Sequence, residues 1–373
     1  MAAIAVLLSL VVTLVILGAS AAIGSQSPIA GDPGLYNVLT TAILNGEIPY
    51  LEYPLEHLPG AVVPMFAVEG LSRISGVDFE TLWPAAMAIA FIATVGMAST
   101  FPTEFDAGKR ILWYSLPLLP LVLFRIEPWL VLWVVASMMF AFRRSWPAQV
   151  AATAVASLIK GWPLLLFALP FQLSKRKLAV VSAAATFAVL IVIALTPGFR
   201  EGREFSGIHT ETVVGSLALV FRSLRGVDAQ LIGAAGASYT AVPAAFVGVN
   251  ALFGVPFLVV AGIQTFRTSD PARLIRTIGL GVLGVLLASP LFSTQFVFWL
   301  VPFVIFTRQR ARQTFLLVSI LTLLSIMVWA PRTLFWDVIV LGRNVLLILL
   351  GIVWVRELVG LEPHTKRDLA LET

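Results

Sequence analysis

Residues 178–195 read LAVVSAAATFAVLIVIAL and contain no charged side chain, whereas three cations, Lys175, Arg176 and Lys177, precede them. As a helix this stretch is about 27 Å long, close to the ~30 Å hydrocarbon core of a bilayer. Comparable stretches recur throughout the 373 residues, of which 59% are hydrophobic and 12% charged. Soluble domains carry about twice that share of charged residues. The sequence therefore predicts an all-α polytopic membrane protein.

The Lys and Arg residues predict how the chain crosses the membrane. They gather in clusters between the apolar stretches, and the positive-inside rule places such clusters in the cytoplasm. The clusters are Lys109 with Arg110, Arg143 with Arg144, residues 175–177, Arg267 with Arg273 and Arg276, Arg308 with Arg310 and Arg312, and Arg356 with Lys366 and Arg367. Residues 1–24 contain no charge and lack the basic start of a signal peptide, so we interpret them as the first span. Both termini are then cytoplasmic.

About twelve crossings follow, in a single transmembrane domain over residues 1–361 with a polar cytoplasmic tail at residues 362–373. After the first, the expected spans are residues 79–100, 111–124, 129–142, 147–159, 162–173, 178–195, 240–266, 274–288, 293–306, 314–329 and 335–354. Two external segments remain, residues 25–78 and 196–239, and the moderately apolar residues 58–74 predict a helix on the outer surface. The short spans around Lys160 are also compatible with broken half-helices inside the bilayer.

Composition also bears on which kinds of site the chain can hold. It has no cysteine, which excludes disulfides, thiolate nucleophiles and zinc–cysteine sites. Its three histidines are far apart and its acids show no ligand spacing, so we expect no metal. The formal charge of +5 reflects cytoplasmic loops, so we expect no nucleic-acid partner. There is no Walker loop or dinucleotide fingerprint, and we expect no separate cofactor.

Carboxylates and cations outside the basic clusters fall on the predicted external side or within spans. Such residues suit transfer from a phosphate-linked donor, because a carboxylate can remove the proton of an attacking hydroxyl and a cation can stabilise the departing phosphate. An enzyme that faces away from cytoplasmic nucleotides needs a donor carrying its own activation. A polyprenyl-phosphate-linked sugar meets this need, since the membrane accommodates its tail.

Four segments of the chain carry short motifs that can be compared with those of known families. The first loop carries Gly31-Asp32-Pro-Gly-Leu-Tyr36, Gly46-Glu-Ile-Pro-Tyr50 and Glu52-Tyr-Pro-Leu-Glu56-His-Leu-Pro59-Gly60. The other segments are Ser157-Leu-Ile-Lys160-Gly-Trp-Pro163, Ile208-His-Thr-Glu211-Thr212, and Ser289-Pro-Leu-Phe-Ser293-Thr-Gln295-Phe-Val-Phe-Trp299-Leu-Val-Pro302. In this order, the four segments resemble motifs of glycosyltransferase family 87, a GT-C family, in its actinobacterial form. His57 and Leu58 stand where the family usually has Tyr-Pro, and Glu127 stands where relatives more often carry Asp.

The resemblance implies a GT-C-type bundle with a helical first external loop. It implies inverting transfer of mannose or a related sugar, as in α-(1,2)-mannosyltransferases, from polyprenyl phosphate to a glycolipid or glycan of the cell envelope. The site would face outward from the plasma membrane, with membrane lipids around it. Asp32 becomes the candidate base, and Glu127 matches the second-loop acid. Candidates for substrate or donor binding are Tyr36, Glu52, Glu56, His57, Lys160, His209, Glu211, Arg222, Arg225, Gln295 and Arg343.

Each of these residues also has a structural interpretation. Asp32 could cap a helix that begins at Pro33, and Lys160 could extend to the membrane interface. Arg343 could bind the donor phosphate or pair with a carboxylate inside the protein. At the level of function, a transporter or flippase of lipid-linked sugars and a scaffolding subunit remain as alternatives. The enzymatic hypothesis requires that Asp32 share an outward-opening cavity with buried cations.

Overall fold

The structure is a computed structural model that describes residues 31–55, 57–172, 175–201, 208–225, 231–234, 237–240, 245–327 and 333–360. The chain groups into two compact units. The first unit comprises Met1–Thr100 and Ser115–Phe205, and the second comprises Phe101–Tyr114 and Ser206–Thr373. The predicted single domain over residues 1–361 stays a prediction, because two compact units can belong to one membrane domain. The expected first span and the tail at residues 362–373 lie outside the described residues.

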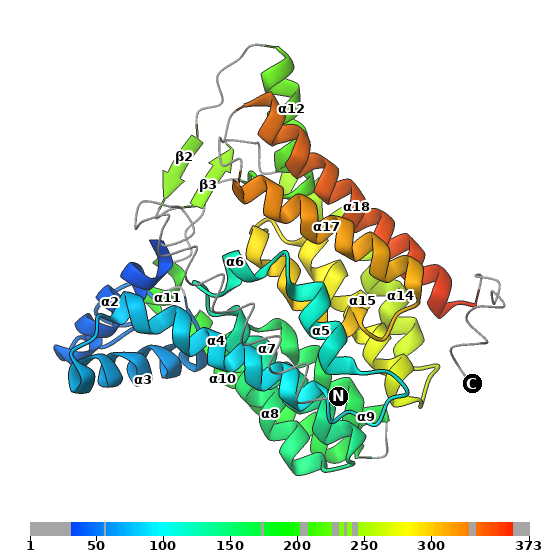
Figure 1. Cartoon of the computed structure of the whole chain (residues 1–373), viewed down its shortest axis with the longest axis horizontal. Coiled ribbons are helices and arrows are strands. Elements are labelled where there is room, and N and C mark those ends of the chain that lie inside the picture. The colour runs from blue at the N-terminus through cyan, green and yellow to red at the C-terminus, as the bar shows by residue number, and fades with distance from the viewer. Residues whose placement is uncertain are drawn as a thin grey trace. The chain divides into compact units, whose positions relative to one another are not determined.

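The first unit is built from helices packed around α7. Its elements are α2 (Gly31–Leu44), α3 (Pro59–Ser75), α4 (Phe79–Ala98), α6 (Leu119–Val122), α7 (Glu127–Phe142), α8 (Trp146–Ile159), the 3₁₀ helix η1 (Trp162–Phe167), α9 (Ala168–Gln172), α10 (Arg176–Ala194) and α11 (Pro197–Glu201). Helix α7 lies between α4 and α8 (Figure 1). Buried polar side chains join it to α8, because Ser137 and Thr153 are 2.7 Å apart and Gln149 donates to Ser137 at 3.0 Å.

The second unit is a bundle around the long helix α18. Its elements are α5 (Ala107–Ser115), β1 (Ile208–His209), α12 (Val213–Leu224), β2 (Leu231–Ala234), β3 (Ala237–Thr240), α13 (Ala245–Leu252), α14 (Val255–Thr265), α15 (Pro271–Ala288), the 3₁₀ helix η2 (Thr294–Leu300), α16 (Val301–Val304), α17 (Gln309–Met327) and α18 (Leu334–Leu358). Helix α18 packs along α17, α12 and α15 (Figure 1). The strands form an antiparallel sheet in the order β1-β3-β2, with Ile208 opposite Thr240.

Two of the predicted segments differ from the structure. The span expected at residues 111–124 is not one continuous helix, because α5 ends at Ser115, α6 is only four residues long, and the two helices belong to different units. Pro117 and Pro120 explain the break, since proline lacks the amide hydrogen that continues a helix. The long loop expected at residues 196–239 instead contains α11, α12 and the three short strands. Leu219 of α12 packs against Trp336 and Val340 of α18.

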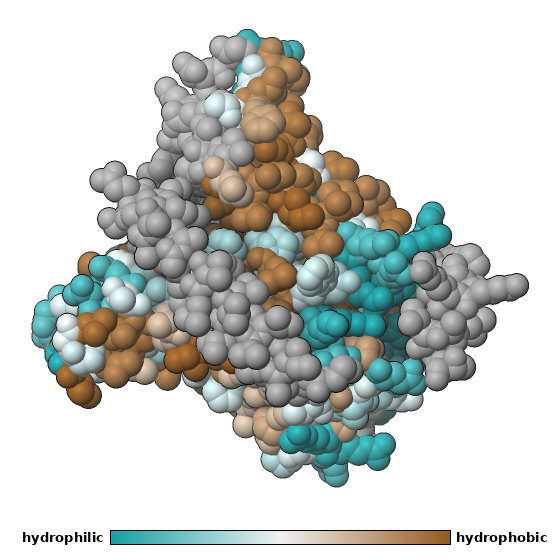
Figure 2. Space-filling model, in the orientation of Figure 1, coloured by the Kyte–Doolittle hydropathy of each residue, from teal (hydrophilic) through white to brown (hydrophobic). Residues whose placement is uncertain are grey.

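The described part of the chain is mostly helical, as predicted, and six of its helices are long and apolar enough to cross a membrane. They are Phe79–Ala98, Arg176–Ala194, Gly248–Thr265, Pro271–Ala288, Gln309–Met327 and Leu334–Leu358. Figure 2 shows hydrophobic side chains along α17 and α18 and hydrophilic ones toward the end of α18. These features support a membrane protein. The number of twelve crossings stays a prediction, because five further apolar helices have only 10–17 residues.

In the first unit, the basic residues collect at one end of the helices. Gln149, near the start of α8, donates to the carbonyl of Leu166 in η1, so these two segments run in opposite directions. The beginning of α8 and the beginning of α10 therefore share an end, which carries Arg143, Arg144 and residues 175–177. Glu127 starts α7 and lies at the other end, about 24 Å away along a 16-residue helix.

The second unit also gathers cations at one end of its helices. Arg273 donates to the carbonyl of Leu358, and Arg110 donates to the carbonyl of Ile305, at 2.8 and 2.9 Å. The amide of Arg308 bonds to the carboxylate of Glu357 at the same end of the bundle. Cations gathered at one end of apolar helices are the pattern that the positive-inside rule describes. Within each unit, the described cations named above therefore lie together at one end, as the prediction of cytoplasmic clusters expects.

Candidate functional site

Asp32 and Arg125 form the centre of a charged cluster in the first unit. Asp32 lies in the first turn of α2, where the helix N-terminus favours a carboxylate, and Arg125 lies between α6 and α7. An Arg125 guanidinium nitrogen forms an ion pair with Asp32 Oδ2. The hydroxyl of Tyr36 donates to the same oxygen at 3.2 Å. Because both contacts use Oδ2, Asp32 Oδ1 has no hydrogen-bond partner among the described residues, and the side chain is 25% exposed.

Aromatic rings fix the position of Tyr36 and therefore of the hydroxyl that contacts Asp32. Tyr36 follows Asp32 by one helical turn, so both side chains lie on one side of α2. Its ring lies 4.7 Å from that of Trp83 and 5.4 Å from that of His57, measured between centroids. All three side chains are buried. The predicted residues Tyr36 and His57 thus lie beside the Asp32–Arg125 pair.

Glu127 is a buried carboxylate at the first residue of α7. Its side chain is 1% exposed, and neither oxygen has a hydrogen-bond partner among the described residues. Arg125 and Lys160 are the cations whose charges act on it. An ionised group buried without hydrogen bonds is costly unless something else satisfies it. The Glu127 carboxylate is therefore balanced in the described chain by the nearby charges of Lys160 and Arg125 rather than by hydrogen bonds.

Lys160 occupies the C-cap of α8, where the backbone becomes extended with φ −145° and ψ 141°. Gly161 and Pro163 follow, and the chain continues as the 3₁₀ helix η1, as the expected break around Lys160 suggested. Gly60 at the start of α3 lies against this end of α8, because an added Cβ would be 2.8 Å from the backbone carbon of Leu158. A larger residue would separate α3 from α8. The packing of these helix ends holds Lys160 near Glu127.

Asp32, Arg125, Glu127 and Lys160 are named the charged cluster below. Three of its four members were predicted site residues, and the structure brings these three into one unit. Arg125 was not a predicted site residue, although a cation two residues before Glu127 in a stretch poor in charge is a usable signal. The cluster contains two anions and two cations, so each charge has an opposite charge close to it. It lies at the end of the unit away from the basic residues.

Two other first-loop candidates have different positions. Glu52 is exposed, and its carboxylate accepts a hydrogen bond of 2.6 Å from the amide of Ile48, four residues earlier. This contact closes a turn, which is a structural role. Glu56 lies outside the described residues.

A second set of polar side chains joins the loop before α12 to α18 in the second unit. It is named the buried network below and contains Glu211, Thr294, Arg343 and Asn344. Arg343 is fully buried, forms an ion pair of 3.6 Å with Glu211, and donates to the Glu211 carbonyl at 2.8 Å. The amide of Asn344 donates to the carbonyls of Glu211 and Thr212, each at 3.0 Å. Thr294 donates to the Glu211 carboxylate. These contacts favour the structural interpretation of Arg343 over a role as phosphate ligand.

His209 completes the buried network. Its Nδ1 accepts from the amide of Glu211 at 3.3 Å, and its own amide donates to the carbonyl of Pro290 at 3.0 Å. Burial lowers the pKa of His209, while Glu211 and a hydrogen bond to the backbone of Phe292 oppose that shift. Burial therefore favours the neutral imidazole, which connects the loop before α12 with the loop before η2. Its predicted role in binding substrate gains no support from these contacts.

The remaining candidates of the second unit have local partners. Arg225 lies over the ring of Phe221 on its own helix, 4.2 Å from the centroid, and Arg222 is half-buried on α12. Gln295 accepts a hydrogen bond from Ser293. Since Arg343 belongs to the second unit and Asp32 to the first, their predicted shared cavity stays a prediction.

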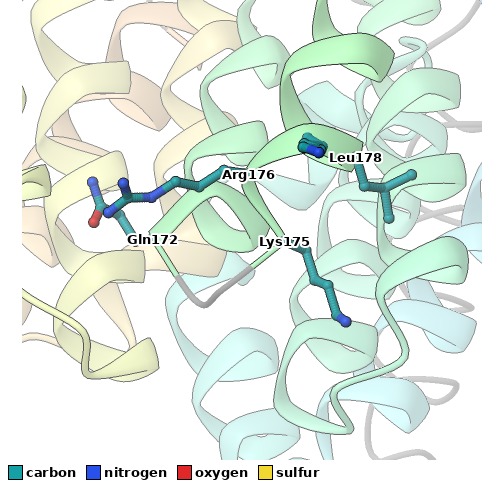
Figure 3. Close-up of a pocket in the computed structure, with 5 residues that line it drawn as sticks. Gln172, Lys175, Arg176 and Leu178 are labelled. Carbon is teal, nitrogen blue, oxygen red and sulfur yellow. The ribbon is translucent and has the colours of Figure 1, made fainter.

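A hollow at the basic end of the first unit contains none of the predicted site residues. It is lined by Gln172, Lys175, Arg176, Lys177 and Leu178 (Figure 3). Within the described residues, no three His, Asp or Glu side chains come together in a way that could hold a metal ion. No protein-family model matches the chain, and no curated protein matches it.

Proposed function

We propose that the protein is an inverting glycosyltransferase that moves a sugar from polyprenyl phosphate to a hydroxyl of a cell-envelope glycolipid or glycan. The observation that carries this proposal is Glu127, a buried carboxylate without a hydrogen-bond partner in the described chain, beside the Asp32–Arg125 pair and Lys160. A site with two acids and two cations matches the needs of sugar transfer from a phosphate. The resemblance to family 87 adds mannose as the proposed sugar.

Asp32 serves as the base in this proposal. Its Oδ1 takes the proton of the acceptor hydroxyl, and the hydroxyl oxygen forms a bond to the anomeric carbon of the sugar. The bond between that carbon and the phosphate oxygen breaks, and the electron pair leaves with polyprenyl phosphate. A single displacement of this kind inverts the anomeric centre. The Arg125 contact to Oδ2 keeps Oδ1 directed elsewhere, which leaves it accessible to the hydroxyl.

The other members of the charged cluster hold the reactants. Lys160 neutralises the charge that grows on the departing phosphate, because a cation near that oxygen stabilises the transition state, while Arg125 holds the base Asp32. Glu127 accepts hydrogen bonds from sugar or acceptor hydroxyls, which orients them and satisfies its buried oxygens. The apolar helices around the site suit a donor whose lipid tail stays in the bilayer.

A direct test measures the transfer of radiolabelled mannose from a synthetic polyprenyl-phosphate donor by the purified full chain in lipid nanodiscs. Asp32→Asn is expected to lower kcat by about 100-fold or more, since general-base catalysis contributes about that much. Donor binding should persist in this variant. Asp78→Asn, an exposed acid of the same loop region, is the matched control and should keep full activity.

Three outcomes would argue against the proposal in different ways. Full activity of Asp32→Asn removes the base assignment. If neither wild type nor variant consumes the donor, but labelled donor moves between the leaflets of vesicles, the result supports the flippase alternative. Equal losses of transfer activity in Asp32→Asn and Asp78→Asn would show that removing either acid disturbs the first external segment, and that Asp32 has no specific role as the base.

A further inference from the structure

The hollow at the start of α10 is lined by three cations, and no Asp or Glu lies near them in the sequence. Lys175, Arg176 and Lys177 are exposed, and they line an open hollow of about 750 Å³ with Gln172 and Leu178. That volume is in the range of ligand pockets. Figure 3 shows the ends of the Gln172 and Arg176 side chains close to one another, with Lys175 directed to another side of the helix start. The guanidinium of Arg176 also lies 5.5 Å from the ring of Phe171.

The cations of the hollow have no carboxylate partner in the described chain. None of the three forms an ion pair with another described residue. The sequence contains no Asp or Glu between Glu127 and Glu201, whereas Arg143 and Arg144 add further positive charge at the same end of the unit. The hollow is therefore a concave site for an anion.

The helix that leaves the hollow is suited to a lipid tail. Helix α10 has 19 residues, is one of the six candidate membrane spans, and has only 11% of that span buried within the protein. Its exposed side chains include Val180, Val181, Phe187, Val189 and Val192. The helix is about 28 Å long, close to the thickness of a bilayer core. The cationic hollow thus lies where a lipid headgroup would be, at the end of an uncovered apolar helix.

We propose that this hollow binds the headgroup of an anionic phospholipid, with the headgroup held among Lys175, Arg176 and Lys177 and an acyl chain along α10. A lipid explains both features, the cations and the exposed apolar side chains that begin within a turn of them. A soluble phosphate would use only the cations. The proposal does not depend on glycosyl transfer, because the site lies at the opposite end of the unit from the charged cluster.

Native mass spectrometry of the purified full chain tests the proposal with phosphatidylglycerol and phosphatidylcholine as probes. Wild type is expected to retain phosphatidylglycerol in preference to phosphatidylcholine. Lys175→Gln/Arg176→Gln should weaken phosphatidylglycerol binding by about 30-fold, estimated from the usual contribution of two cations near a membrane surface. Arg143→Gln/Arg144→Gln, which removes two exposed cations from the same end, should change binding by less than about 3-fold.

Equal losses in the two double variants would overturn the proposal in favour of a diffuse charge effect. Displacement of phosphatidylglycerol by millimolar inorganic phosphate would overturn it in favour of a soluble anion. Footprinting of the unaltered chain provides a measurement that does not depend on how a variant folds. Phosphatidylglycerol should protect Lys175 and Lys177 from a water-soluble acylating reagent but leave Lys109 reactive, and equal labelling with and without lipid would contradict the site.

Discussion

Replacing Arg343 with methionine should destabilise the protein by about 3–5 kcal/mol, the usual cost of leaving one partner of a buried ion pair alone. The structure supports a value in this range. Arg343 is 0% exposed and donates to Glu211 and Asn344, and Glu211 is 4% exposed. Without the guanidinium, the Glu211 carboxylate would stay buried with Thr294 as its one described hydrogen-bond donor. Methionine fills a similar volume, so lost packing contributes little.

Equilibrium unfolding in mixed detergent and SDS micelles, followed by tryptophan fluorescence, measures the change. The chain has ten tryptophans, and Trp336 is buried on the same helix as Arg343. Arg356→Met is the matched control, because Arg356 is exposed in the last turn of α18, and its loss should cost less than about 1 kcal/mol. The double variant Glu211→Gln/Arg343→Met should recover most of the lost stability, since it removes both charges.

The result that would refute this reasoning is a stable Arg343→Met variant that no longer binds the polyprenyl-phosphate donor. That outcome would assign Arg343 to the donor phosphate and make its contacts with Glu211 a resting arrangement. A double variant that is no more stable than Arg343→Met would also contradict the ion pair. The two interpretations therefore predict opposite results from one set of proteins.

Three further expectations concern other groups of the chain. Glu127→Gln should remain within about 1 kcal/mol of wild-type stability yet lose at least about 10-fold in transfer, because it removes an anion that only a ligand satisfies. Burial keeps the pKa of His209 below its usual 6.5, so near that pH the unfolded chain binds more protons than the folded chain. The free energy of unfolding should therefore fall as the pH is lowered from 7.5 to 5.5. Unfolding curves of His209→Gln should show a weaker dependence on pH. The chain has no cysteine, so the variants Asp32→Cys and Arg144→Cys each carry a single thiol. A membrane-impermeant maleimide should label these two thiols from opposite faces of sealed vesicles. Labelling of both thiols from the same face would contradict the crossing of α7 and α8.

The helices of the fold could be predicted well wherever apolar residues ran without proline. Helix α10 covers nearly the residues expected, because nothing in its sequence interrupts it. The stretch at residues 111–124 is similarly apolar, but Pro117 and Pro120 divide it into two short helices, so apolar character alone does not predict a continuous helix there. The spacing of Arg222 and Arg225 predicts a short helix in the external segment, and α12 forms there but begins at Val213.

The candidate site was predictable in part, because charge is scarce in this chain. Asp32, Glu127 and Lys160 stood out against apolar neighbours, and they lie in one unit near Arg125. The buried network was harder to interpret, since an arginine within a span has the same sequence signal whether it binds a ligand or a carboxylate. Only the contacts of Arg343 with Glu211 separate the two roles, and they depend on helix packing that no local pattern contains.

The depth of the charged cluster bears on whether the protein is an enzyme or a transporter. Transporters bind substrate near the middle of the bilayer, where interrupted helices meet. Helix α8 does end at Lys160, but its 14 residues place this lysine about 21 Å from the basic end, beyond the midpoint of a ~30 Å core. Glu127 lies about 24 Å from that end along α7. In the proposed mechanism, a cluster at this distance from the basic end would meet its acceptor from outside while the donor tail stays in the membrane. This distance agrees better with the proposed transfer than with the alternative of transport through the middle of the bilayer.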